Sequence, residues 1–271
     1  MIFIKGYGQM CNNILQYAHA YAWGKENGQI VVSMRFAYKY KYFALCKERY
    51  HNPITYLVIK FLLKLRLIKY YLFQEPNDLS SNVLNELQKK RVSVIDGWEF
   101  RFPALFLKYK EDIKQLFKIE DKIFNKTKEY LESKASENEM CLGLHIRRGD
   151  YRKWMGGKYM YDDDTYAYYV KQFIKLNIGK KVNVFISTND NKFDIELFKE
   201  KVGSKYIYFF NKNSIYDLCL LSLCDYIIGP KSTFSLVASF YRDIPIFWIE
   251  KPKEEISLES FKNFDNLFMY A

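Results

Sequence analysis

Short apolar runs alternate with amphipathic segments along the whole chain, a pattern typical of α/β proteins with parallel sheets. Runs of strand character occur at residues 2–4, 29–34, 92–98, 141–146, 182–186, 206–210, 225–230 and 245–249. Helical spacing lies between many of them, at residues 14–22, 166–176, 214–224 and 236–241. Because strands that alternate with helices indicate βαβ units, the pattern predicts doubly wound sheets.

A polar stretch near the middle predicts a domain boundary. Residues 109–135 form a long charged helical region, and the least apolar stretch of the chain, residues 133–138, follows it. Linkers between domains are polar and exposed, so we expect two domains, residues 1–136 and 137–271. A helix is predicted over residues 258–270 and is a candidate to pack back on the first domain.

The most apolar segment, residues 56–73, is interrupted by Lys60, Lys64, Arg66 and Lys69. Four cations exclude a simple membrane-spanning helix. On a helical wheel drawn over the whole segment these cations do not share one face, which disfavours an interfacial helix. The sequence favours a cationic helix packed on the domain, and peripheral membrane contact is the alternative.

Composition narrows the class of protein. The 271 residues are 49% hydrophobic, with 42 basic and 31 acidic residues and a net charge of +11, which favours anionic partners without choosing among them. The five cysteines form no CxxC pair, and this predicts buried thiols rather than a disulfide framework. The first residues enter a strand pattern with no signal-peptide layout, so we expect a cytoplasmic protein.

One strand ends in a cluster of charges. The apolar run at residues 141–146 leads into Arg147, Arg148 and Asp150. In open α/β sheets ligands bind at the carboxyl ends of strands, and arginine grips phosphate with two parallel hydrogen bonds. We interpret Arg147 as a diphosphate ligand and Asp150 as an acid that holds the turn or a partner arginine. A structural Arg–Asp pair in a surface turn is the alternative.

A second strand exit carries hydroxyl groups. Residues 231–235, Lys-Ser-Thr-Phe-Ser, open the helix that follows the strand at residues 225–230. Free N–H groups at a helix N-terminus bind anions. Two such sites on neighbouring strands would hold a diphosphate from both sides. Ser232 as a simple N-cap is the alternative.

Other polar clusters have ordinary interpretations. Asp162, Asp163 and Asp164 could form a metal site, but acids in the first turn of a helix are explained by its dipole, which we favour. Ser214 is predicted as an N-cap with Asp217 in the capping-box position. The first βα turn, residues 5–13, contains glycines without the GxGxxG fingerprint. We expect the two remaining histidines, at 19 and 51, to serve packing or the surface.

These motifs resemble glycosyltransferase family 11, the α-1,2-fucosyltransferases, within the wider group of α-1,2-, α-1,6- and protein O-fucosyltransferases. His-Ile-Arg-Arg-Gly-Asp at residues 145–150 is similar to the HxRRxD motif of the group. Residues 217–235 resemble its block ending in a Ser/Thr-Phe-Ser turn. Residues 12–18 and 97–100 resemble the N-terminal motif and the aromatic loop. The matches span residues 8–249 in the family's order.

The resemblance implies a GT-B-type α/β fold, with two doubly wound Rossmann-like domains facing across a cleft, and an inverting transfer of fucose from GDP-fucose without a required metal. The first domain would take the acceptor and the second the nucleotide sugar. Arg147, Asp150 and Asn12 would act in catalysis, with Arg147 at the β-phosphate. The donor would be bound by His145, Arg148, Asn189, Asp190, Asp217, Ser232, Thr233, Phe234 and Ser235.

The sequence departs from the family at two places. The glycine-rich first turn is here Gly-Gln-Met-Cys-Asn-Asn at residues 8–13, and Met155 stands where α-1,6 relatives have a general base. Asp150 and Asp162–Asp164 are the candidate bases. The acceptor is expected to be an oligosaccharide or lipid-linked glycan, modified at galactose O2 and reached at the inner face of the membrane.

Two other functions stay open at this point. The same fold could use another nucleotide sugar. A non-catalytic polyanion-binding module would use the positive charge, although the basic residues are scattered and no nucleic-acid motif is present, so we expect no nucleic acid as a partner.

Overall fold

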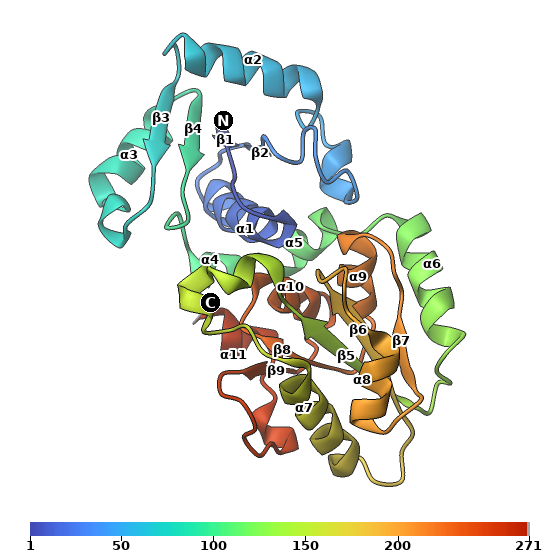
Figure 1. The fold of residues 1–271 in the computed structure, drawn as a ribbon. Coiled ribbons are helices and arrows are strands. Elements are labelled where there is room, and N and C mark those ends of the chain that lie inside the picture. The colour runs from blue at the N-terminus through green and yellow to red at the C-terminus, as the bar shows by residue number, and fades with distance from the viewer. Residues whose placement is uncertain (270–271) are drawn as a thin grey trace. The chain divides into compact units, whose positions relative to one another are not determined.

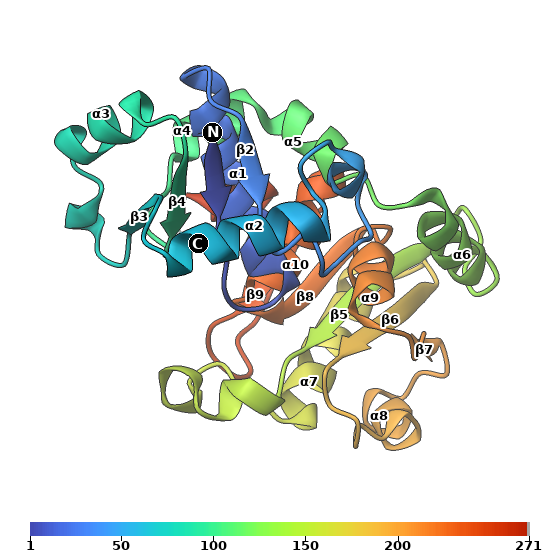
Figure 2. The same ribbon diagram turned by 90° about the horizontal axis from the view of Figure 1, so that it is seen from above.

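The computed structural model describes residues 1–269 and forms two compact units, residues 1–120 and 121–271. Each unit has one parallel sheet with helices on both faces (Figures 1 and 2). The predicted GT-B-type α/β class is therefore confirmed in its mixed α/β architecture with parallel sheets.

The first unit contains a four-stranded sheet in the order β2-β1-β4-β3. Its strands are β1 (Ile2–Ile4), β2 (Val31–Ser33), β3 (Lys69–Leu72) and β4 (Ser93–Asp96). Its helices are α1 (Met10–Glu26), α2 (Pro53–Lys64), α3 (Ser81–Lys89), α4 (Pro103–Lys108) and α5 (Lys110–Leu116), with 3₁₀ turns at Ala44–Lys47 and Pro76–Asp78. Helices α1 and α2 lie on opposite faces of this sheet (Figure 1).

The second unit contains a five-stranded sheet in the order β7-β6-β5-β8-β9. Its strands are β5 (Met140–Ile146), β6 (Val182–Thr188), β7 (Ile207–Phe209), β8 (Tyr226–Pro230) and β9 (Ile246–Ile249). Its helices are α6 (Asp121–Glu132), α7 (Asp163–Leu176), α8 (Ile195–Val202), α9 (Ser214–Leu221), α10 (Thr233–Arg242) and α11 (Phe264–Phe268), with 3₁₀ turns at Gly149–Arg152, Trp154–Gly157 and Leu258–Ser260. The strand order reverses between β5 and β8, which makes their carboxyl ends the topological switch point.

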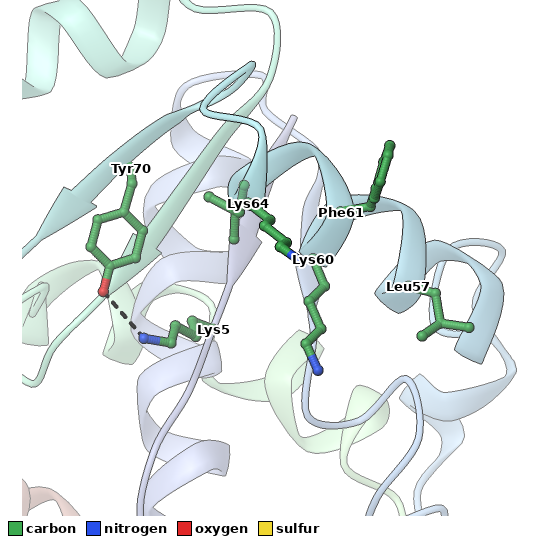
Figure 3. Close-up of a pocket in the computed structure, with 7 residues that line it drawn as sticks. Lys5, Leu57, Lys60, Phe61, Lys64 and Tyr70 are labelled. Atoms are coloured by element: carbon green, nitrogen blue, oxygen red, sulfur yellow. Dashed lines mark hydrogen bonds between the residues drawn. The ribbon is translucent and has the colours of Figure 1, made fainter.

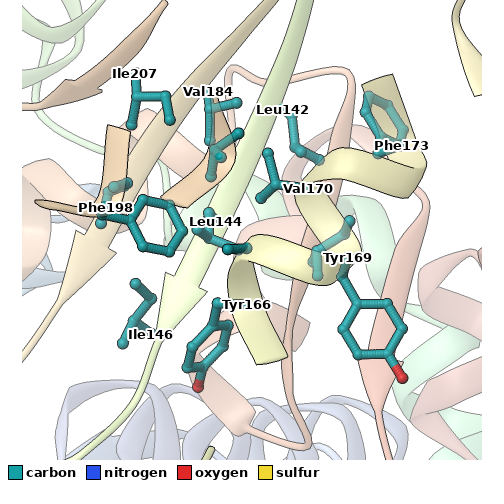
Figure 4. Close-up of a cluster of buried hydrophobic side chains, with 14 of the residues drawn as sticks. Leu142, Leu144, Ile146, Tyr166, Tyr169, Val170, Phe173, Val184, Phe198 and Ile207 are labelled. Carbon is teal, nitrogen blue, oxygen red and sulfur yellow. The ribbon is translucent and has the colours of Figure 1, made fainter. Parts of the chain in front are cut away.

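The core of the second unit determines which face of β5 carries its apolar side chains and which face carries His145. Leu142, Leu144 and Ile146 are fully buried against Tyr166 and Phe173 of α7 (Figure 4). Successive side chains of a strand alternate between faces, so His145 lies on the opposite face from these three. Each fully buried leucine or phenylalanine stabilises the fold by about 1.5–3 kcal/mol. The core therefore fixes the orientation of β5, and with it the position of the charged turn.

The boundary between the units lies between residues 120 and 121 and not at 136/137, so the predicted boundary is wrong. Helix α6 belongs to the second unit because Ile123 and Thr127 are buried there and the Tyr130 ring stacks on Phe210 at 4.1 Å. The predicted helical region 109–135 is two helices. The polar stretch 133–138 is a turn before β5 that is exposed except at Ala135, and this exposure explains its composition.

The segment at residues 56–73 is a helix and a strand. Helix α2 ends at Lys64, and β3 begins at Lys69. Of the four cations, only Lys60 and Lys64 lie on the helix, where they are one turn apart. The prediction drawn from a helical wheel over residues 56–73 therefore fails, because the segment after Lys64 is not helical. Ile59 packs on the sheet through a cluster with Phe3 and Val94, which confirms contact with the domain. Across residues 1–269, no helix combines the length and the apolar character that crossing a bilayer requires.

The last helix is short and packs within the second unit. The Phe264 ring of α11 lies 5.1 Å from the Phe240 ring of α10. This contact differs from the expectation that a terminal helix packs back on the first domain. Tyr270, the end of that predicted helix, lies outside the described residues. The cysteines are free thiols, as predicted, and all but Cys46 are buried.

Candidate active site

The exits of β5 and β8 meet at one edge of the second sheet. Gly229 of β8 lies so close to β5 that a Cβ there would be 2.8 Å from the His145 carbonyl oxygen. The His145 ring lies 5.1 Å from the Phe234 ring at the start of α10. The Tyr151 phenol donates a hydrogen bond to the Lys231 carbonyl oxygen at 2.8 Å. The two clusters picked out in the sequence therefore form one site at the switch point.

Arg147 has one weakly held partner. Its Nη2 donates to Asp150 at 2.8 Å across a single turn, and the Asp150 side chain is 56% exposed. The guanidinium lies over the Tyr151 ring at 5.5 Å, and its Nε is buried without a hydrogen-bond partner among residues 1–269. Exposed ion pairs contribute little to stability. An anion of higher charge than a carboxylate can therefore replace Asp150 at low cost.

Arg148 is bound more tightly, to two carboxylates on different elements. Its Nη1 donates to Asp190 at 3.0 Å, and its Nη2 forms an ion pair with Asp163 of α7. The backbone N–H of Lys192, and then Arg148, hold the pKa of Asp190 below its usual range, so Asp190 stays charged. These pairs join β5, β6 and α7. The protein itself neutralises Arg148, and this disfavours the predicted contact between Arg148 and a donor.

Asn189 fixes the backbone of the same turn. Its Oδ1 accepts from the Arg148 N–H at 2.7 Å, and its Nδ2 donates to the Arg148 carbonyl at 3.2 Å. Gly149 has φ of +61°, and a Cβ there would lie 3.1 Å from Asn189 Nδ2. Glycine is favoured in this left-handed conformation. Asn189 thus shapes the turn that carries Arg147.

Besides Arg147 Nε, Arg148 Nε and Asn183 Oδ1, two buried polar atoms of the second unit have no hydrogen-bond partner among the described residues. His145 Nδ1 and Asp217 Oδ1 are buried without a hydrogen bond among residues 1–269. Burial, and then the charge of Arg147, lower the pKa of His145 to about 3, so its imidazole is neutral. Burial raises the pKa of Asp217 to about 7, and a hydrogen bond with Ser187 opposes that shift. Buried polar atoms are nearly always paired in native proteins, so these two are candidates to meet a ligand.

The hydroxyl turn is built around the N-terminus of α10. Ser232 is the N-cap, and its Oγ accepts from the Phe234 N–H at 3.1 Å. Thr233 and Phe234 are half-buried in the first turn. Ser235 is fully buried, where its Oγ donates to the Ser232 carbonyl and accepts from the Trp248 indole at 3.1 Å. These two bonds inside the protein and the burial of Ser235 disfavour the predicted donor contact by this residue.

The three aspartates at the start of α7 have separate partners. Asp162 is the N-cap and accepts from the Thr165 N–H at 2.8 Å, Asp163 pairs with Arg148, and Asp164 pairs with Lys201. This confirms the helix-terminus interpretation of these acids. Across residues 1–269, no group of three His, Cys, Asp or Glu side chains is arranged to hold a metal ion.

The remaining predicted residues have mixed outcomes. Asn12 lies in the first turn of α1, in the first unit. Helix α9 is capped by Asn213 rather than Ser214, so the capping box with Asp217 is wrong. His19 and His51 are buried and accept hydrogen bonds from the backbone N–H groups of Phe102 and Ser33, which confirms the packing role.

Sequence reasoning missed two side chains of this site. Tyr151 connects the two turns, and Ser187 supports Asp217 from the end of β6. Tyr151 directly follows the HxRRxD motif, but nothing in its spacing indicates the Lys231 carbonyl. Ser187 lies among the polar residues that end β6, and this position is the feature of the sequence that could have indicated a role in the site.

The fold is similar to solved fucosyltransferases. A mutant of FUT1 from Arabidopsis thaliana in complex with GDP is 12% identical, with a TM-score of 0.66 over 97% of this chain and 73% of that one. Fucosyltransferase NodZ from Bradyrhizobium is 13% identical, with a TM-score of 0.59 over 93% of this chain and 96% of that one. POFUT1 in complex with GDP-fucose is 10% identical, with a TM-score of 0.54 over 94% of this chain and 96% of that one.

The sequence itself settles the family. No curated protein matches the chain. The family model described as glycosyl transferase family 11 matches residues 23–244, which include the β5 and β8 exits and all of the strands between them. The chain therefore belongs to glycosyltransferase family 11.

Proposed function

We propose that this protein transfers fucose from GDP-fucose to a hydroxyl group of a glycan, with inversion at the sugar carbon. The convergence of the β5 and β8 exits at the switch point carries the proposal, because this is where doubly wound sheets bind nucleotides. Family membership and the GDP and GDP-fucose complexes of the similar structures support it. Galactose O2 of an oligosaccharide or lipid-linked glycan is the proposed acceptor position.

The diphosphate would lie between the two turns. Arg147 would exchange its exposed Asp150 partner for the β-phosphate, and Ser232, Thr233 and Phe234 would meet the phosphates at the N-terminus of α10. Leaving of GDP builds negative charge on the β-phosphate oxygen. Preorganised donors aimed at such charge are the largest contribution to this kind of catalysis, and losing one costs about 10²–10³ in rate.

The nucleoside would meet the unpartnered buried atoms of His145 and Asp217. Asp217 is an acceptor of the kind that pairs with the N–H groups of guanine, and the neutral His145 would contact the ribose. Arg148 and Asn189 would act by holding the turn, and Asp190 by holding Arg148. Asn12 would face the sugar and diphosphate from the first unit.

Asp150 is the proposed general base. Of the four candidate acids, Asp162, Asp163 and Asp164 are committed to the N-cap of α7, to Arg148 and to Lys201. Asp150 is released when Arg147 turns to the diphosphate. It would then accept the proton of the acceptor hydroxyl as the new glycosidic bond forms and the bond to GDP breaks.

The decisive experiment is a donor panel on the purified protein. We expect GDP release and glycan product with GDP-fucose, and at least a hundredfold lower rates with GDP-mannose and with UDP-sugars. The glycosidic linkage is read from the product by NMR, which separates α-1,2 from α-1,6. Turnover should persist in EDTA. Preference for another donor would replace fucose in the proposal, and strict Mn²⁺ dependence would revive a metal role for the α7 aspartates.

A further inference from the structure

Helix α2 presents an apolar face to solvent. Ile54, Leu57, Val58 and Phe61 are 75%, 60%, 50% and 60% exposed, and Ile59 is the one residue of the helix that is fully buried. Their spacing of three and four residues places these four side chains on one face. Leu65 and Leu67 continue the exposed apolar surface past the end of the helix. Contiguous exposed apolar surface on a folded protein marks an interaction site.

Cations border this face and no acid neutralises them. Lys60 and Lys64 lie one turn apart beside the apolar residues, and Arg66 follows the helix. The sequence has no Asp or Glu between Glu48 and Glu75. Lys5 pairs with Asp96 and Lys69 with Glu86, whereas Lys60, Lys64 and Arg66 have no carboxylate partner among residues 1–269. We call Ile54, Leu57, Val58, Lys60, Phe61, Lys64 and Arg66 the α2 face.

A groove runs beside the helix. It has a volume of about 920 Å³ and is lined by Lys5, Leu57, Lys60, Phe61, Leu63, Lys64 and Tyr70 (Figure 3). Lysine ammonium groups and apolar side chains therefore share one open hollow. Such a lining suits a molecule with an anionic head and an apolar tail.

Arg66 occupies a position where the backbone prefers glycine. It has φ of +57° and ends α2 in a Schellman motif, in which the Leu67 N–H bonds the Leu62 carbonyl and the Arg66 N–H bonds the Leu63 carbonyl, both at 3.0 Å. Glycine is the usual residue here because it has no Cβ penalty. The arginine supplies a charge at the rim of the α2 face that glycine could not.

We propose that the α2 face docks on the surface of an anionic phospholipid bilayer. The apolar side chains would enter the boundary between headgroups and acyl chains, and Lys60, Lys64 and Arg66 would lie at headgroup level. A symmetric dimer through the same face would bring identical surfaces together and set unneutralised cations against each other. The charge of the face thus favours a bilayer over a second copy of this chain.

The test is co-sedimentation of the full chain with vesicles of phosphatidylcholine and phosphatidylglycerol in equal amounts, at low and high salt. Wild type should bind these vesicles, bind less at high salt, and not bind pure phosphatidylcholine. Each cation near an anionic surface contributes about fivefold to binding, from about 1 kcal/mol, so Lys60→Gln with Lys64→Gln should weaken binding about thirtyfold. Leu57→Ser with Phe61→Ser should weaken it at least tenfold.

The matched control is Lys89→Gln with Lys90→Gln, which removes the same charge from exposed lysines at the end of α3. Its binding should stay within twofold of wild type, and thermal melts should show all variants folded. Equal loss in the control, or full binding by the α2 variants, would overturn the proposal. So would a concentration-dependent dimer that the α2 variants abolish, without vesicle binding. Because no donor or acceptor is present, this result stands apart from the proposed transferase activity.

Discussion

The carboxyl edges of the two sheets carry different chemistry. In the first unit, Asp96 at the end of β4 pairs with Lys5 at 2.9 Å and accepts from the Tyr70 phenol at 2.7 Å. Next to it Arg101 stacks 4.0 Å from the Trp98 ring, which meets Tyr7 edge-on. In the second unit the edge has a cation, Arg147, whose one carboxylate partner is exposed, beside the hydroxyl groups at the N-terminus of α10. Aromatic faces suit the apolar faces of sugars, whereas the second edge suits an anion.

The difference indicates how a glycosyltransferase divides its work. Under the proposed function, the second edge would stabilise the negative charge that appears when GDP leaves. The first edge has its own charges largely paired and offers rings. If the two edges divide the work in this way, substitutions at the second edge should affect GDP binding and fucose transfer, and substitutions at the first edge should affect KM for the acceptor.

The largest effect is expected at Arg147. Arg147→Lys should lower kcat/KM for fucose transfer by about 10²–10³ with little change in thermal stability, because a point charge cannot replace the two-pronged guanidinium. Arg148→Lys is the matched control. It should lower the free energy of unfolding by roughly 1–3 kcal/mol through its contacts with Asp163 and Asp190. Near-full activity of Arg147→Lys would contradict the assignment.

The close approach of β8 to β5 gives the next effect. In Gly229→Ala the new methyl group would lie 2.8 Å from the His145 carbonyl and force the two strand ends apart. Overpacking of this kind costs about 1–3 kcal/mol of stability. We expect GDP affinity, measured by calorimetry, to fall at least tenfold. Ala238→Gly, in the interior of buried α10, is a control for a similar loss of stability without moving the strand ends. Unchanged GDP affinity in Gly229→Ala would show that the spacing of the strand ends is not needed.

Asp217 should make nucleotide binding depend on pH. Its carboxyl has a pKa of about 7, so below pH 7 it is neutral and cannot accept two N–H groups of guanine. GDP affinity should fall up to tenfold for each pH unit below 7, and Asp217→Asn should remove that dependence while binding GDP weakly. A pH profile that is the same in wild type and Asp217→Asn would contradict this role.

The Asp217 carboxyl should also make the free energy of unfolding depend on pH. Its pKa is above the unfolded value of about 3.9, so the folded state binds more protons between about pH 4 and 7, and the free energy of unfolding falls as pH rises through that range. Asp217→Asn should therefore be more stable than wild type at pH 8, by roughly 2–4 kcal/mol, and no more stable at pH 4. Urea unfolding at both pH values measures the difference.

The smallest effect is expected at the first edge. Trp98→Ala should raise KM for the glycan acceptor about fivefold, because one ring contact contributes about 1 kcal/mol, and should leave GDP affinity unchanged. Trp98→Phe, which keeps a ring, should recover most of the loss. A change in GDP affinity, without a change in KM for the acceptor, would contradict the proposal that the first edge serves the acceptor and the second the donor.

The sequence predicted the strand exits well for a physical reason. Strands of a parallel sheet are buried on both faces, so β5, β6 and β8 read as apolar runs and their ends are visible where polar residues begin. Strand β3 gave no such signal, because Lys69, Tyr70 and Leu72 are exposed at the edge of the first sheet. It was therefore merged with α2 into one segment.

The sequence could not predict which acid pairs with each arginine of the site. Arg147 and Arg148 are adjacent, yet one meets an acid three residues away and the other meets acids 15 and 42 residues away. Only the fold brings Asp163 and Asp190 to Arg148. Similarly, Ser235 belongs to the hydroxyl turn by sequence, but the indole of Trp248 places it in the core.

The tie from Tyr151 to Lys231 ends on a main-chain oxygen, and Asn189 likewise holds the main chain of Arg148. Neither interaction involves the side chain of residue 148 or 231, so a substitution at residue 231 keeps the carbonyl group that accepts the hydrogen bond from Tyr151. The spacing of the two turns therefore depends on the side chains of Tyr151 and Asn189 and not on which side chains residues 231 and 148 carry.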